Sequence, residues 1–260
     1  MNNMLQRVFA VAGLSVTELF RRRDVIVAFL LAAVILVPLA AFNLFGVKGV
    51  VRYLREVALL LVWLFSLVIA ITTAARQLPA ELEARTIYPL LAKPLRRGEF
   101  LAGKFLGAAL AAMASALLFY LCYALMDGLR EGAWPGLLFL QAVTLHLAAL
   151  VLVCALVILG SVLLTPSANI TVAGLVTVGM LLFGQRLADI AGGASAVVAG
   201  LALAAHLVLP HLEFFDLRLH VVHEWPLLDA ATFGAILLYA ACYSAAALVL
   251  AAWRLQKRNL

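Results

Sequence analysis

The stretch "GLLFLQAVTLHLAALVLVCALVILGSVLLT", residues 136–165, contains no Asp, Glu, Lys or Arg. A helix needs about 20 apolar residues to cross the roughly 30 Å hydrocarbon core of a bilayer, so this stretch is long enough to span it. Of the 260 residues, 66% are hydrophobic and only 12% are charged, whereas about a quarter of the residues in soluble domains are charged. The composition therefore predicts an integral membrane protein.

Further apolar runs on either side of this stretch are long enough to cross the membrane. The run that ends at residue 185 is short, and it reaches spanning length because Ser167, Asn169 and Gln185 are polar but uncharged. The sequence thus predicts an all-α membrane protein with one transmembrane domain over residues 1–260. The six expected spans are residues 25–47, 57–75, 100–126, 136–165, 167–185 and 231–253.

Basic residues near the ends of the spans predict the orientation, because cytoplasmic loops collect Lys and Arg. Residues 21–23 are all Arg and precede the first span, while Arg254, Lys257 and Arg258 follow the last. The loop between the second and third spans carries six more basic residues. Both termini are therefore expected in the cytoplasm, which fits an even number of crossings.

Residues 4–23 predict an amphipathic helix before the first span. Apolar residues such as Leu5, Val8 and Phe9 recur at helical spacing among polar ones, and the three arginines end the segment. Such a helix suits the inner membrane surface, where its arginines meet anionic headgroups. The alternative is a helix that packs on the protein's own cytoplasmic loops.

The segment 190–229 is expected to be re-entrant or to lie at the outer membrane interface. Its first half is apolar, and its second half mixes aromatic side chains with His and acidic residues at 211–224. The order H-V-V-H-E at 220–224 is not the H-E-x-x-H of zinc proteases. A polar segment that shapes the outer mouth of a pathway is favoured, and a lipid-modifying metalloenzyme with a metal at 211–224 is an alternative. His146 and His206 lie alone in apolar runs, where hydrogen-bonded core histidines are expected.

Residues 98–104 match a phosphate-binding loop by spacing alone. Gly98 is followed after four residues by Gly103 and Lys104, as in G-x-x-x-x-G-K-[ST], but Phe105 replaces the hydroxyl residue that binds Mg²⁺. The stretch also leads straight into a membrane span, whereas a phosphate loop follows a buried strand. The stretch is therefore expected not to bind a nucleotide. The favoured interpretation of the whole chain also includes no cofactor, no metal and no catalytic residues of its own.

The apolar runs that form the cores of the spans contain no Asp, Glu, Lys or Arg. Proton pumps and ion-coupled carriers usually place ionisable residues near the middle of the membrane. Their absence indicates that the energy comes from another protein. An ion-driven carrier stays open as an alternative, because backbone carbonyls alone can hold Na⁺.

The most charged segment is the loop 76–99, for which a short helix beneath the membrane is predicted. Pro79 suits a first helical turn, and Glu81 can pair with Arg85 one turn later. The segment up to Lys104 resembles the permease subunits of ABC-2 type exporters. In these, a short acidic cytoplasmic element leads into the pattern T-[IL]-x-x-L-L-x-x-P-[IL]-x-R-x-x-[FI]-[LI]-x-G-K. The matching residues are Glu81, Glu83, Thr86, Ile87, Leu90, Leu91, Lys93, Pro94, Leu95, Arg97, Phe100, Leu101, Gly103 and Lys104.

A second similarity lies in the outer segment, where residues 209–216 resemble the family's L-P-N-L-E-x-F-[ND], with His211 in place of Asn. The resemblance implies a bacterial inner-membrane exporter subunit that pairs with a second copy or a related permease, contacts membrane lipids and an ATPase subunit, and binds no nucleic acid. In that family the loop between the second and third spans forms a coupling helix. The implied coupling residues are Glu81, Glu83, Arg85, Thr86, Lys93, Pro94 and Arg97. The substrate and its binding residues are not predicted.

Overall fold

The computed structural model describes residues 48–78, 97–131, 136–186 and 196–257, together with parts of the segment 6–17. Every element in these ranges is helical, and five helices are long and apolar enough to cross a membrane, which confirms the expected all-helical membrane fold. The expected span 25–47 and most of the loop 76–99 lie outside the described residues. The five helices are α3 (Lys48–Gln77), α6 (Arg97–Glu131), α7 (Leu137–Leu163), α8 (Pro166–Phe183) and α12 (Ala230–Lys257).

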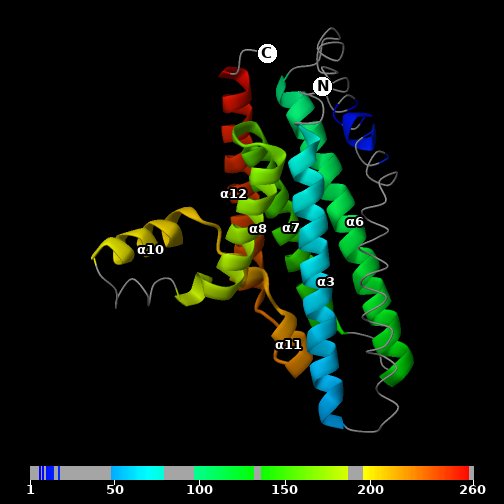
Figure 1. The fold of residues 1–260 in the computed structure, drawn as a ribbon. Coiled ribbons are helices and arrows are strands. Elements are labelled where there is room, and N and C mark those ends of the chain that lie inside the picture. Colours follow the sequence, from blue (N-terminus) through cyan, green and yellow to red (C-terminus); the bar gives the residue numbers. More distant parts are fainter. Residues whose placement is uncertain are drawn as a thin grey trace.

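Helix α7 occupies the centre of the bundle (Figure 1) and contacts α3, α6, α8 and α12. It is apolar all round, as is typical of a helix that lies inside a protein core or a membrane. In its most apolar stretch 67% of the residues are buried, against 17% for α8 and 22% for α12. The charge-free stretch from which the membrane fold was predicted is thus the core helix of the bundle.

A tight turn separates α7 from α8. Leu164 and Thr165 have extended backbones, and the N–H of Leu164 donates to the carbonyl of Gly160 at the end of α7. Pro166 disfavours a helical conformation at Thr165, and it suits the first turn of α8, where its missing N–H costs nothing. The proline therefore divides two adjacent apolar runs into an antiparallel helix pair.

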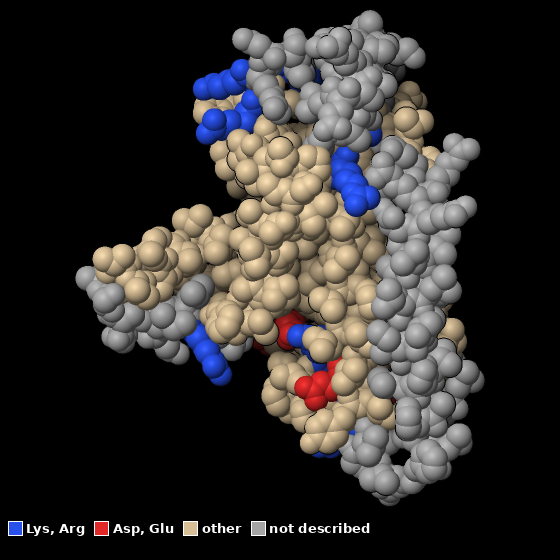
Figure 2. All heavy atoms as spheres, in the orientation of Figure 1, with Lys and Arg blue, Asp and Glu red and all other residues tan. Residues whose placement is uncertain are grey.

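Figure 2 shows a broad belt of uncharged atoms between two zones that carry charge. Basic residues of the described chain gather at the end where α12 terminates, and they include Arg76, Arg97, Arg254 and Lys257. At the other end, Arg55 of α3 pairs with Asp127 of α6 at 2.9 Å. This distribution fits a protein whose middle lies in hydrocarbon and whose two ends meet water and headgroups.

The segment before α12 contains two helical parts that meet at a bend. Helix α10 (Ala196–Val208) projects sideways from the bundle in Figure 1, and a 3-10 turn η3 (Leu212–Phe215) and helix α11 (Arg218–His223) follow it. The pair 197–208 and 212–223 is bent by 46° and is apolar enough to count together as a broken span or a re-entrant loop. This geometry fits the expectation for the segment 190–229.

Asp229 marks the start of α12. Its carboxylate accepts a hydrogen bond of 3.2 Å from the backbone N–H of Thr232, which is the bond of a helix N-cap. Hydrogen bonds from the side chain and backbone of Thr232 hold the pKa of Asp229 below its usual value. The last span therefore begins immediately after a charged cap at the membrane surface.

Candidate functional site

Arg97, near the end of the expected coupling loop, contacts the end of the last span. Its guanidinium Nη1 donates to the carbonyls of Leu255 and Gln256 at 3.2 and 3.1 Å. The last carbonyls of a helix have no partner within the helix, and a cation is favoured there by the helix dipole. The start of α6 is thus fastened to the end of α12. The other predicted coupling residues, which lie outside the described residues, are Glu81, Glu83, Arg85, Thr86, Lys93 and Pro94.

We expect Arg97→Ala to lower the stability of the α6–α12 contact by about 1–2 kcal/mol, because hydrogen bonds that involve a charged group contribute about 1.5–3 kcal/mol and this one is partly exposed. Unfolding of the purified protein in mixed micelles measures the change. Arg52→Ala is the control. Arg52 lies in α3 at the opposite end of the bundle from Arg97, and its removal is expected to have little effect. Equal losses in the two variants would contradict the role given to Arg97.

Two further charged side chains near Arg97 are buried at the head of α6. Glu99 exposes 7% of its surface and Lys104 only 2%, and the Lys104 ammonium lies 5.9 Å from the centre of the Phe100 ring. Burial of a charge is costly unless other groups compensate it. The first turns of α6 therefore bury charged side chains within the protein. The glycine spacing in the sequence did not indicate this burial.

The described part of the N-terminal segment packs on this same region. Val8 and Ala12 are buried, and a Cβ added to Gly103 would lie 2.7 Å from the Cβ of Val11. Leu14, in contrast, is 68% exposed. One face of the N-terminal helix therefore packs on α6 itself, and Gly103 permits the close approach.

A polar joint links α3, α7 and α8 inside the bundle. The Asn169 side-chain amide donates to the carbonyl of Val157 and to the hydroxyl of Ser161, both at 2.9 Å. The Ser161 hydroxyl in turn lies 3.3 Å from the carbonyl of Ala75 in α3. A Cβ on Gly160 would lie only 2.1 Å from Oδ1 of Asn169, so the glycine provides the space that the amide occupies.

A second polar joint links α3, α6 and α7 around His146. The ring is fully buried, its Nε2 lies 3.0 Å from the Ser66 hydroxyl, and its Nδ1 lies 2.9 Å from the Tyr120 hydroxyl. The Trp63 ring stacks on it at 4.2 Å between centroids. The expectation of a hydrogen-bonded core histidine is therefore confirmed for His146. For His206 it is not, because its buried Nδ1 has no partner among the described residues.

The His and acidic residues of 211–224 separate into different contacts. His211 Nδ1 lies 2.9 Å from Glu213, whose carboxylate packs against Gly184, while His220 and His223 contact the Trp225 ring. Arg218 pairs with Asp216 at 2.6 Å and lies over the Trp63 ring. Within the described residues, no group of three His, Cys, Asp or Glu side chains is arranged to hold a metal ion. Glu213 and Arg218 therefore contact the bundle, whereas the other pairs lie within the segment itself.

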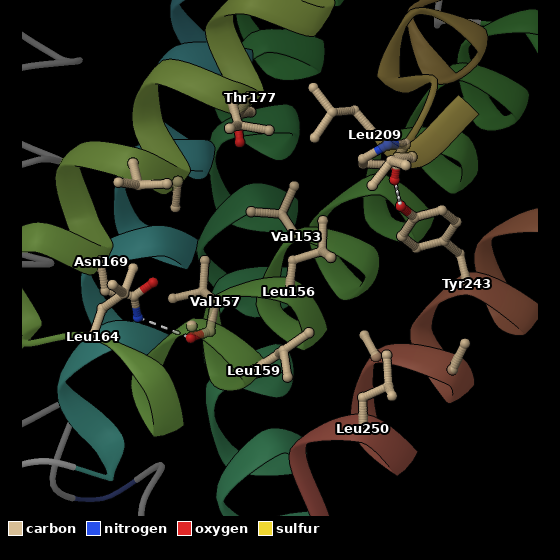
Figure 3. Close-up of a pocket in the computed structure, with 18 residues that line it drawn as sticks. Val153, Leu156, Val157, Leu159, Leu164, Asn169, Thr177, Leu209, Tyr243 and Leu250 are labelled. Carbon is tan, nitrogen blue, oxygen red and sulfur yellow. Dashed lines mark hydrogen bonds between the residues drawn. The ribbon is translucent and has the colours of Figure 1, made fainter. Parts of the chain in front are cut away.

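A cavity of about 460 Å³ lies between α7, α8 and α12. In Figure 3 aliphatic side chains such as Val153 and Leu156 point into it, and the polar groups of Asn169 and Tyr243 lie at its edges. Both of these groups are hydrogen-bonded within the protein, since Asn169 bonds to α7 and the Tyr243 hydroxyl donates to the carbonyl of Val208. Thr177 of α8 is a third polar residue of the lining, and it is buried. The cavity is thus an apolar space on the side of the bundle.

The amino-acid sequence matches a known family of membrane proteins. A family model described as ABC-2 family transporter protein matches residues 11–260, which is nearly the entire chain. The chain belongs to the ABC-2 family. A search of the curated proteins found no match to it. Membrane proteins of the ABC-2 family are typically the non-catalytic subunits of transporters, and membership implies association with an ABC ATPase.

The family membership confirms the resemblance drawn from the loop 76–104. Of the coupling residues predicted for this ABC-2 protein, the structure describes only Arg97. Sequence reasoning missed the bond between Arg97 and α12, because residues 97 and 255 are far apart in the chain. It also missed the burial of Glu99 and the cluster of Ser66, Tyr120 and His146. The one sign of that cluster in the sequence was a polar residue within each of three apolar runs.

Proposed function

We propose that this ABC-2 protein is the membrane subunit of an ATP-driven exporter. Two such subunits would enclose the translocation pathway, and a separate ATPase would supply the energy. The observation that carries the proposal is the family match over residues 11–260. The predicted spans contain no Asp, Glu or Arg, and Lys104 at the head of the third is their one Lys. This adds support, because an ion-driven carrier usually places such charged groups near the middle of the membrane.

The loop 76–99 is proposed as the element that couples the ATPase to the spans. Its two described ends, Gln77 and Arg97, lie at the end of the bundle where α12 terminates (Figure 1). Arg97 bonds directly to α12, and the N-terminal helix packs close by on Gly103. A displacement of the loop would therefore act on three elements together. ATP can drive such a displacement only if the ATPase contacts differ between its two states.

The N-terminal helix and the end of α12 lie at the same end of the bundle, as the proposed cytoplasmic location of both termini requires. The described part of the N-terminal helix contacts the head of α6, and the end of α12 bonds to Arg97, so both lie on the same side. Lys48, the first residue of α3, lies at the opposite end in Figure 1. We propose that residues 25–47 provide the crossing between them, which completes six spans.

Charge reversal in the coupling loop tests the proposal. We expect Glu81→Lys combined with Glu83→Lys to reduce ATP-driven transport by about tenfold or more, because coupling between two sites typically amounts to 1–3 kcal/mol. The assay is co-purification of an ABC ATPase with the chain, followed by ATP hydrolysis and transport in vesicles. The reference is the unaltered chain, with which the ATPase is expected to co-purify.

The matched control is Glu224→Lys, which makes the same change at a side chain that is 83% exposed at the other end of the bundle. It is expected to leave ATPase association and transport unchanged. If the double variant keeps full ATPase association and full transport, the loop is not the coupling element. If the ATPase fails to bind even the unaltered chain, the exporter assignment itself is wrong.

A further inference from the structure

The cavity between α7, α8 and α12 has the chemistry of a site for a hydrocarbon chain. Its volume of about 460 Å³ lies in the range of small-molecule pockets, roughly 300–1,000 Å³. Its lining is mostly aliphatic and contains three polar side chains, those of Asn169, Thr177 and Tyr243. The amide of Asn169 and the hydroxyl of Tyr243 donate their hydrogen bonds within the protein. A polar ligand would lose its bonds to water there without replacement, whereas an apolar one would not.

The cavity opens toward the lipid side of the bundle. Its walls are formed by α7, α8, α12 and residues 208–210. Of the five spanning helices, α8 and α12 are the least buried. Among its wall residues, Val172 of α8 and Leu250 of α12 are 48% and 52% exposed. A chain from the surrounding bilayer can therefore enter sideways between these two helices.

The cavity is short enough to lie within one leaflet. Along α12 it extends from Tyr243 to Leu250, which corresponds to about 10 Å at a rise of 1.5 Å per residue. One leaflet provides about half of the roughly 30 Å hydrocarbon core. Arg254 follows Leu250 by one helical turn, so the cavity lies within the leaflet next to the C-terminal end of α12.

Two cations continue the same stripe of α12 beyond the cavity. The lining residues Tyr243, Ala247 and Leu250 are spaced three or four apart, and Arg254 and Lys257 continue that spacing. Both basic side chains lie over the ring of Trp253, at 5.4 and 3.7 Å, and neither forms an ion pair within the described chain. Trp253 is 47% exposed, as is common for aromatic residues at the membrane surface.

We propose that this groove binds an anionic membrane phospholipid, with an acyl chain in the cavity of α7, α8 and α12 and the phosphate at Arg254 and Lys257. The apolar cavity accounts for the chain, the two cations account for the headgroup, and the helical stripe places them in line. The site goes beyond the proposed export function, because it requires neither the ATPase nor the transported substrate.

Photo-crosslinking tests the acyl-chain half of the site. The purified full chain is placed in phosphatidylcholine vesicles that contain phosphatidylglycerol with a diazirine in its acyl chain, and crosslinked peptides are mapped by mass spectrometry. We expect label on the lining residues of α8 and α12. Ala246→Trp or Val172→Trp fills the groove and should reduce this labelling by about fourfold for each methylene group that it excludes.

The control variant is Ala245→Trp, which adds the same side chain at an exposed position of α12 outside the cavity. It should leave the labelling unchanged. Two filling variants on different helices ensure that one misfolded variant does not decide the result. Unchanged labelling in both would overturn the proposal, and so would capture of a second copy of the chain by a photoreactive residue at position 250.

Removal of the cations tests the headgroup half. With Arg254→Gln and Lys257→Gln, the preference for phosphatidylglycerol over phosphatidylcholine should fall by about fivefold for each charge. Arg52 of α3 is an exposed basic residue at the other end of the bundle, and Arg52→Gln should leave the preference unchanged. Equal effects at the two ends would show a general attraction to anionic lipid rather than a site. These binding assays need no ATP, so they can fail without affecting the exporter assignment.

Discussion

Gly160→Ala is expected to destabilise the bundle by about 2–4 kcal/mol. The added Cβ would lie 2.1 Å from Oδ1 and 2.9 Å from Cγ of Asn169, so the amide must move away. Movement breaks its hydrogen bonds to Val157 and Ser161, each worth about 0.6 kcal/mol on average inside a membrane, and overpacking costs a further 1–3 kcal/mol. Unfolding in mixed micelles measures the loss.

A double variant separates the collision from the hydrogen bonds. In Gly160→Ala with Asn169→Ala, the amide is absent and the new methyl group has space. The combined loss should therefore be smaller than the sum of the two single losses, because the residues are in direct contact. Gly174→Ala, a change at an α8 position with nothing within 4 Å, serves as the control. Strict additivity of the two variants would contradict the proposed contact.

His146→Leu is expected to destabilise the bundle by about 2–4 kcal/mol. The substitution removes the hydrogen bonds to Ser66 and Tyr120 and the stacked contact with Trp63. A buried polar group that loses its partner costs about 1–3 kcal/mol, and an aromatic contact adds about 0.5–1.5 kcal/mol beyond its buried area. The same unfolding experiment measures the effect, with tryptophan fluorescence as a second signal because Trp63 is part of the cluster.

Tyr120→Phe removes only the hydroxyl and is the matched comparison. It should cost about 1 kcal/mol, and in the presence of His146→Leu it should cost less, because the bond is then already gone. If Tyr120→Phe were as damaging as His146→Leu, the stability would depend on the tyrosine rather than on the histidine joint.

The sequence was sufficient for the spans whose apolar runs are long. Helix α7 lies where residues 136–165 predicted it, because a helix without charges can be stable only inside the membrane or the bundle. Its end is set by Thr165 and Pro166, whose local preferences are readable from the chain. Helix α8 needed uncharged polar residues to reach spanning length, and one of them, Asn169, is a structural joint.

The segment before α12 was less predictable. Residues 190–210 are apolar enough to suggest a span, but hydropathy does not show that the chain turns at Pro210 and bends by 46°. The polar joints were beyond sequence reasoning for another reason. His146 and Ser66 are 80 residues apart, and only the packing of α3 against α7 brings them together.

The candidate coupling site was predicted through its pattern, and six of its seven residues lie outside the described chain. Arg97 shows what the pattern cannot contain, since its partners are backbone carbonyls of α12 rather than side chains. Every residue has a backbone carbonyl, so the sequence of the distant helix does not show that it holds the partner of Arg97. The loop motif identifies the element, whereas the structure identifies the helix to which it is attached.

The shortness of α8 has a consequence for the bilayer itself. Its 18 residues extend about 27 Å, whereas the 35 residues of α6 extend about 52 Å. A helix slightly shorter than the roughly 30 Å hydrocarbon core is accommodated by local thinning of the membrane. Lipids beside α8 would therefore be compressed while those beside α6 are not, and the protein would impose an uneven membrane thickness around its own perimeter.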